Sequence, residues 1–162
     1  MKKFLVVIWG VLCFCACSTT KKQASQQTAV SIEFNADSAF AFCVAQCNFG
    51  PRTMNSEAHE LCGQWIASKF QQYDYQVELQ KADLKGYDGT LLKSTNIIAK
   101  SSKQANARLM ICAHWDSRPW ADNDPDSANW HKPVMAANDG ASGVAVMLEL
   151  ARLLQQHDST GV

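Results

Sequence analysis

The short apolar run at residues 109–113 sets the strongest limit on the architecture of this chain. It reads Leu-Met-Ile-Cys-Ala and lacks the polar alternation of a half-solvated strand. A run of this kind is typical of a central strand that is buried on both faces of a sheet. It therefore predicts an open α/β sheet, in which side chains at the carboxyl ends of the strands line the crevice where ligands bind.

Two polar side chains, His114 and Asp116, follow this predicted strand at its C-terminal end. Because strand side chains alternate with a period of two, both point to the same side. A carboxylate can thus lie behind the imidazole and fix its tautomer, as it does around metal-binding histidines. A single His-x-Asp triplet is common by chance, and its usual role is structural.

A third candidate, Asp139, lies in the glycine-rich run Asn138-Asp139-Gly-Ala-Ser-Gly143 at the start of an apolar helix. Such a turn lets the backbone approach a bound ion and directs the carboxylate into the same crevice. By itself, a run of this composition is more often a turn followed by a helix cap. The presence of both motifs in one chain, in this order, favours a functional crevice that contains His114, Asp116 and Asp139.

Three motifs together resemble the zinc-dependent glutaminyl cyclases of bacteria, which share a fold with zinc aminopeptidases. They are His114-Trp-Asp116-Ser-Arg-Pro-Trp120, Asn138-Asp139-Gly-Ala-Ser-Gly143 and Val146-Met-Leu-Glu-Leu-Ala-Arg152, and the similarity extends back to Phe49-Gly-Pro-Arg52. The resemblance covers residues 40–154. It is specific for the superfamily, whereas the choice of cyclase over peptidase rests mainly on residues 116–120 and the helix.

The resemblance implies a zinc enzyme that converts the N-terminal glutamine of peptides or proteins into pyroglutamate and releases ammonia. In that family an Asp, a Glu and a His hold one zinc ion and a neighbouring Glu moves the proton, so Asp139 would be the Asp ligand. His114 and Asp116 then belong to a crevice network. No catalytic residue is assigned in this fragment, because the other ligands and the acid/base are not among these residues, and we expect it to be inactive alone.

The same resemblance implies a cis peptide bond between Asp139 and Gly140. Two alternatives to the cyclase stay open. In a zinc aminopeptidase of the same superfamily two metal ions bind, with His114 as a ligand of one and Asp139 bridging both. The other alternative is a non-catalytic, truncated lipoprotein.

Residues 1–16 are predicted to form a signal peptide, since Lys2 and Lys3 precede an apolar core too short to span a bilayer. Phe14-Cys-Ala-Cys17 resembles a bacterial lipoprotein processing site, so we expect Cys17 to carry lipid. An ordinary cleaved signal is the alternative. The protein would be exported and anchored to the cell envelope on the periplasmic side, with residues 17–31 as a flexible tether and residues 32–162 as an incomplete zinc-peptidase-like domain.

Charge and cysteine spacing exclude two classes of site. With 15 basic and 15 acidic residues, the chain offers no basic field for nucleic acid. The cysteines after the tether lack the Cys-x-x-Cys spacing of a zinc site, and buried thiols are favoured over a single disulfide. They are Cys43, Cys47, Cys62 and Cys112.

The remaining pattern predicts two helices, two strands, a loop and a last helix. One helix is capped by Asn35 or Asp37 and ends near Cys47, with Phe40, Val44 and Cys47 on its apolar stripe; the next runs from residue 55 to about 73. Strands are expected at residues 75–80 and 91–99, and residues 118–133 are expected to be a surface loop, with calcium binding as a minor alternative. The last helix spans residues 141–156. The fold class is α/β, a layered domain with a mixed, mostly parallel central sheet and helices on both faces, truncated after the first part of the sheet.

Overall fold

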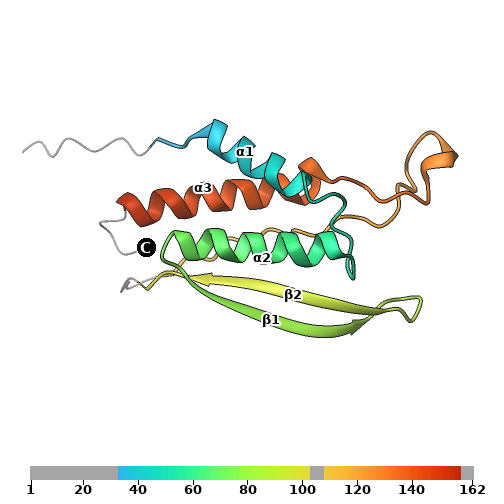
Figure 1. The fold of residues 1–162 in the computed structure, drawn as a ribbon, viewed down its shortest axis with the longest axis horizontal. Coiled ribbons are helices and arrows are strands. Elements are labelled where there is room, and N and C mark those ends of the chain that lie inside the picture. Colours follow the sequence, from blue (N-terminus) through green and yellow to red (C-terminus); the bar gives the residue numbers. More distant parts are fainter. Residues whose placement is uncertain (1–32, 103–107, 158–162) are drawn as a thin grey trace, which may run out of the picture. The chain divides into compact units, whose positions relative to one another are not determined.

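The computed structural model describes residues 33–102 and 108–157 (Figure 1). The predicted signal peptide, the lipidated Cys17, the tether and part of the connection at residues 100–107 lie outside the described residues. The elements, in order, are α1 (Ala36–Cys47), α2 (Glu57–Gln72), β1 (Gln76–Lys85), β2 (Leu91–Lys100), a 3-10 turn (Ser127–Asn129), a wide turn (Ala137–Ala141) and α3 (Ser142–His157).

Side-chain caps determine where the first two helices begin. The Oδ1 atom of Asn35 accepts a hydrogen bond from the backbone of Ser38 at 2.9 Å, and the Oγ atom of Ser56 accepts one from His59 at 3.1 Å. Each cap satisfies a backbone N–H that has no partner inside its helix. The predicted starts of both helices are therefore confirmed.

The apolar stripe predicted for α1 is wrong. Phe40 and Val44 are 71% and 42% exposed, whereas Ala39 and Gln46 are buried. The reason is that polar groups attach α1 to α3: the backbone N–H of Asn35 donates to the buried carboxylate of Glu149 at 2.9 Å. At the other end of α1, the side-chain amide of Gln46 donates to the carbonyl of Ala141 at 2.9 Å.

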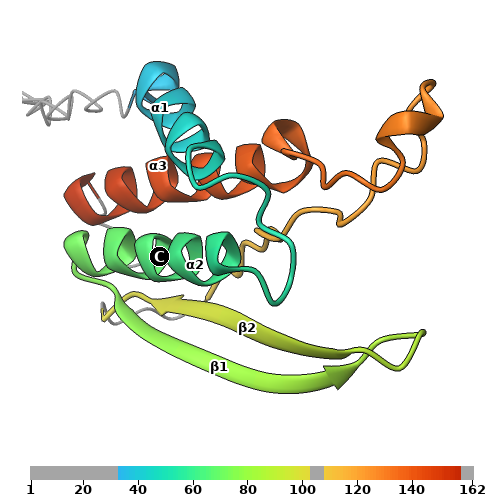
Figure 2. The same ribbon diagram turned by 45° about the vertical axis from the view of Figure 1, so that its right-hand side comes forward.

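The hydrophobic core lies between α2 and α3. Figure 2 shows α2 between the β1–β2 hairpin and α3. The buried side chains of this core come from the two helices in equal number, and they are Cys62, Ile66, Phe70, Val144, Leu148 and Ala151. Fully burying one such large aliphatic side chain contributes about 1.5 to 3 kcal/mol.

The strands β1 and β2 form an antiparallel pair, in register from Gln76 opposite Lys100 to Lys85 opposite Leu91. Gly89, with φ of +86°, closes the hairpin turn in the left-handed region that favours glycine. Both strands were predicted, although β1 continues to Lys85 and not only to residue 80. Together with the helices, this pair confirms the α/β class, and it is the part of the sheet that the described residues contain.

Residues 109–113 differ from the prediction of a buried central strand. None of them belongs to a strand, and Leu109, Met110 and Ile111 are 74%, 83% and 43% exposed. A strand becomes central only when neighbouring strands satisfy its backbone and other layers cover its side chains, and the described residues supply neither. The apolar composition of residues 109–113 therefore indicates that they require burial, but it does not show whether the described residues bury them.

The thiols of the four cysteines in the described part of the chain are free. Cys62 is buried, Cys43 and Cys47 are partly buried, and Cys112 is exposed, so the prediction of buried thiols is wrong for Cys112. No helix within residues 33–102 and 108–157 has the length and apolar character to cross a membrane.

Candidate functional site

The structure brings His114, Asp116 and Asp139 together. The Nδ1 atom of His114 lies 3.3 Å from Oδ1 of Asp116, and its Nε2 atom lies 2.8 Å from Oδ1 of Asp139. The two carboxylates therefore contact opposite nitrogens of one imidazole ring. Histidine and aspartate point to the same side of residues 114–116, as the spacing predicted.

The two carboxylates favour the protonated form of the imidazole. Partial burial by itself lowers the pKa of His114, but the hydrogen bond with Asp139 and the negative charge of Asp116 outweigh it, so the pKa is raised. The donor roles of the two nitrogens depend on the tautomer, because a neutral ring donates from one nitrogen and a protonated ring from both. All three side chains are accessible to solvent, Asp139 most of all at 82% exposed.

The turn before α3 directs Asp139 towards His114. Ala136 has φ of +56°, in the left-handed region, and Asp139 has non-helical angles of −103° and +83°. No described peptide bond is cis, so the predicted cis bond between Asp139 and Gly140 is wrong. The change of direction is produced by the backbone dihedral angles at these residues.

Gly140 permits the close approach of this turn to His114. A Cβ atom at position 140 would collide with the carbonyl oxygen of His114 and would lie 2.8 Å from Nδ1 of its ring. The glycine-rich run was predicted to allow a close backbone approach to an ion. In the structure, the group that Gly140 approaches is the histidine.

Sequence reasoning assigned no role to Arg52, although its motif was part of the resemblance. Arg52 is fully buried, and its guanidinium reaches the carbonyl oxygens of Trp115 and Ala136 at 3.2 and 3.0 Å. A charged residue directly after Phe-Gly-Pro, between the two predicted helices, was the available signal. Spacing along the chain could not identify these contacts, because the residues are far apart in sequence.

Trp115 attaches the histidine segment to α2 and to the hairpin. Its ring stacks on His59 with centroids 3.8 Å apart, and its Nε1 atom donates to the carbonyl of Thr95 at 3.3 Å. Burial lowers the pKa of His59, and the charges of Asp116 and Glu60 oppose this effect. The stack keeps His114 and Asp116 on a segment that is held from two sides.

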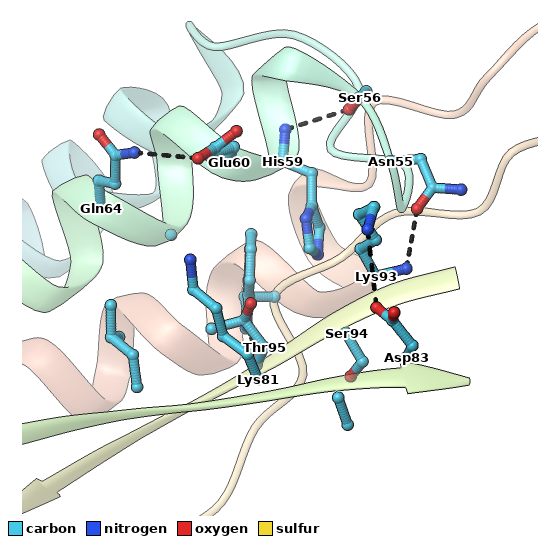
Figure 3. Close-up of a pocket in the computed structure, with 14 residues that line it drawn as sticks. Asn55, Ser56, His59, Glu60, Gln64, Lys81, Asp83, Lys93, Ser94 and Thr95 are labelled. Carbon is cyan, nitrogen blue, oxygen red and sulfur yellow. Dashed lines mark hydrogen bonds and ion pairs between the residues drawn. The ribbon is translucent and has the colours of Figure 1, made fainter. Parts of the chain in front are cut away.

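A cavity of about 360 Å³ adjoins this stack, between α2 and the hairpin (Figure 3). Asn55, His59 and Lys93 line it, and its lining does not include His114, Asp116 or Asp139. Lys93 forms an ion pair with Asp83 at 3.7 Å, and its backbone donates to the side chain of Asn55 at 2.8 Å. The cavity is therefore separate from the histidine site.

The acidic loop at residues 118–133 uses its carboxylates within the loop. Asp122 accepts from Arg118 at 2.7 Å, Asp124 accepts from the backbone of Asp126 at 2.9 Å, and Asp126 accepts from the backbone of Ala128 at 3.0 Å. The loop is largely exposed, as predicted. In the described part of the chain, no group of three or more His, Cys, Asp or Glu side chains is arranged to hold a metal ion.

Comparisons with known proteins show which families this chain is similar to. Residues 96–161 match the model of Peptidase family M28. A leucine aminopeptidase precursor from Bacteroides thetaiotaomicron is 49% identical, with a TM-score of 0.75 over 77% of this chain and 43% of that chain. The glutaminyl cyclase of the same organism, solved with N-acetylhistamine, gives the same values, and the glutaminyl cyclase of Porphyromonas gingivalis is 41% identical with a TM-score of 0.76 over 80% of this chain and 45% of that chain.

The fold and these matches place the similarity at the level of the zinc aminopeptidase superfamily: the M28 model matches residues 96–161, and these solved structures cover 77% or more of the chain. Within it, the chain is similar to the bacterial glutaminyl cyclases, as the three motifs predicted. It spans less than half of the length of these solved structures. It also spans 30% of a curated relative from Pyrenophora teres, a "Probable zinc metalloprotease" that is 28% identical over 82% of this chain.

Proposed function

We propose that this chain is part of a glutaminyl-peptide cyclotransferase, which converts an N-terminal glutamine into pyroglutamate with release of ammonia. The observation that supports it is the pair of contacts at His114, with Asp116 on one nitrogen and Asp139 on the other. The similar solved structures that are named glutaminyl cyclases give the substrate class. Its substrates would be peptides or proteins with an N-terminal glutamine.

Zinc is the proposed cofactor, with Asp139 as one ligand. The residues present fit part of this role: the Asp139 carboxylate is a suitable oxygen donor, is 82% exposed and faces an imidazole. The described residues do not supply a complete set of ligands, so the other ligands would have to come from elsewhere in the protein. Bound zinc supplies Lewis-acid polarisation of the side-chain amide carbonyl of the substrate.

The chemistry that the protein has to support is intramolecular. The α-amine nitrogen bonds to the side-chain carbonyl carbon, the bond from that carbon to the amide nitrogen breaks, and one proton moves from the amine to the departing ammonia. Because both reacting groups belong to one residue, proximity comes from the substrate. In this chain, His114 keeps the Asp139 carboxylate in a fixed direction, and Asp116 keeps the ring of His114 in place.

A zinc aminopeptidase is the second candidate. Two observations favour it: the matching family model is a peptidase family, and one similar structure is named a leucine aminopeptidase precursor. In that enzyme His114 and Asp139 would both be metal ligands, and their 2.8 Å contact would be replaced by metal coordination. Two bound zinc ions per protein would indicate the peptidase and one would indicate the cyclase.

The experiment compares two reactions of the full-length protein. We expect ammonia release from a glutamine-initiated peptide and no hydrolysis of a leucine anilide. Asp139→Asn should reduce ammonia release by about 100-fold or more, because metal activation contributes several kcal/mol to such reactions. The matched control is Asp122→Asn, which changes an exposed loop carboxylate and should have no effect.

Other outcomes decide between the alternatives. Leucine release without ammonia would replace the cyclase with the aminopeptidase. If neither substrate reacts, the result supports the third alternative, a non-catalytic protein, and its lipidation is tested separately at Cys17.

A further inference from the structure

Arg52 is a buried cation whose guanidinium makes no ion pair with any carboxylate in the described part of the chain. Its side chain is fully buried, and it donates to backbone carbonyls: Nη2 to Ala136 at 3.0 Å, Nε to Trp115 at 3.2 Å, and Nη1 to Gly50 at 3.2 Å and Gln46 at 3.4 Å. Burying a charge is costly unless polar groups replace its water. The guanidinium is therefore stable only while these carbonyls remain in position.

Two of these carbonyls belong to the two segments that form the histidine site. Trp115 lies between His114 and Asp116, and Ala136 begins the turn that carries Asp139. The connection is also reciprocal, because the backbone N–H of Ser117 donates to the carbonyl of Arg52 at 3.0 Å. Arg52 is thus bonded on both sides of the His114–Asp139 contact without touching either residue.

The far end of the same turn has a second, independent attachment. The side-chain amide of the buried Gln46 donates to the carbonyl of Ala141 at 2.9 Å. The Sγ atom of Cys43 lies 3.3 Å from the carbonyl of Ala137. These contacts fix the turn to α1, but neither of them reaches the segment that carries His114.

We propose that Arg52 is a positioning residue that sets the separation between the His114–Asp116 segment and the Asp139 turn. The planar guanidinium is the bridge: its Nε and Nη2 atoms donate in fixed directions to Trp115 and Ala136. Lysine cannot do this, since its three donors are on one nitrogen at the end of a flexible chain. The geometric part of this proposal stands by itself, and its consequence for zinc rests on the proposed function.

The test uses the full-length protein and the variant Arg52→Lys, which keeps the charge and most of the side-chain volume. Amide hydrogen exchange is measured at Ser117 and Ala141, whose N–H groups donate to the carbonyls of Arg52 and Ala136. We expect exchange at both amides to become faster by about tenfold or more, as for the loss of one hydrogen bond to a charged group. Zinc affinity, measured by competition with a chromogenic chelator, should fall about 10- to 100-fold.

The matched control is Ile66→Ala, which creates a cavity in the core between α2 and α3 and removes none of the hydrogen bonds of Arg52. If R52K and I66A lower thermal stability alike but only R52K changes local exchange and zinc affinity, Arg52 acts through position and not through general stability. Equal effects of the two variants on both readouts, or wild-type exchange in R52K, would overturn the proposal.

A second variant tests the positioning role of Arg52 if R52K does not fold. Gln46→Met removes the side-chain hydrogen bond to Ala141 and keeps the Gln46 backbone carbonyl that accepts from Arg52. We expect faster exchange within residues 136–141 and unchanged exchange at Ser117, whereas faster exchange at Ser117 would contradict the role of Arg52. A wild-type protein that binds no zinc or releases no ammonia would refute the proposed function, and the exchange comparison would still decide the role of Arg52.

Discussion

His59 is a histidine that is easier to protonate in the unfolded chain than in the folded protein. It is only 6% exposed, and burial lowers its pKa below the ordinary value of 6.5. Between the two pKa values the unfolded state binds more protons, so acid favours unfolding. The contribution of His59 to stability is thus complete above about pH 6.5 and is lost as the pH falls below it.

The variant His59→Phe tests this pH dependence of stability. It keeps an aromatic ring against Trp115 and removes the group that binds the proton. The free energy of unfolding of the wild type should fall between pH 7.5 and pH 5.5 more than that of the variant, by at most about 1.4 kcal/mol per pH unit. Urea unfolding at the two pH values gives the difference. Equal pH dependence in both proteins would show that His59 does not contribute.

Gly140→Ala tests the contact between the turn and His114. The new Cβ would collide with the His114 carbonyl, and overpacking of this kind costs about 1 to 3 kcal/mol. We expect lower thermal stability together with weaker zinc binding, because His114 has to move away from Asp139.

Gly89→Ala is the control for this prediction, since it introduces strain at a positive φ in the exposed hairpin turn, where the new Cβ would meet only the flexible Lys85 side chain at 3.9 Å. It should lower stability and leave zinc affinity unchanged. If G140A binds zinc as the wild type does, the approach of Gly140 has no role in the site.

Some of these residues could be recognised from the sequence and others could not. The spacing of His114 and Asp116 predicted their common direction because two residues are one period of an extended backbone. Arg52 and His59 act through neighbours far away in sequence, Ala136 and Trp115, and no local period describes such contacts. The cis bond was expected from a resemblance. The structure has no cis bond at this turn and has a positive φ at Ala136.

Helices and strands were likewise predicted correctly where their cause is local in the sequence, and wrongly where it depends on a distant element. The caps at Asn35 and Ser56 are local, and both helix starts were predicted. The buried face of α1 depends on α3, and the environment of residues 109–113 depends on strands that the described residues do not contain, so both predictions failed.

The packing of α3 on α2 can be tested with two substitutions on the same helix. Leu148 is fully buried in the core, whereas Val146 is 44% exposed. Leu148→Ala should lower the free energy of unfolding by about 2 to 5 kcal/mol, because it removes buried methyl groups and leaves a cavity. Val146→Ala should change it by less than about 0.5 kcal/mol. Similar losses in urea unfolding would mean that α3 does not pack on α2 through Leu148.

For the molecule as a whole, the proposed lipid on Cys17 would attach the protein to a membrane. The signal peptide and Cys17 lie outside the described residues, so lipidation stays a prediction from the sequence. Cys17→Ser should move the protein from the membrane fraction to the soluble fraction, since acyl chains contribute about 0.8 kcal/mol per buried CH₂ group. The measurement is a cell fractionation followed by immunoblotting. A serine variant that remains with the membranes would contradict the lipoprotein hypothesis.

The exposed side chains of Leu109, Met110 and Ile111 have a consequence for biogenesis. Short apolar stretches without a partner are where nascent chains associate with one another, and holdase chaperones bind such stretches. Until other strands cover residues 109–111, association competes with folding, and the yield depends on which is faster. We therefore propose that this protein, exported as its N-terminal sequence predicts, needs a chaperone partner in the envelope until other strands cover this segment.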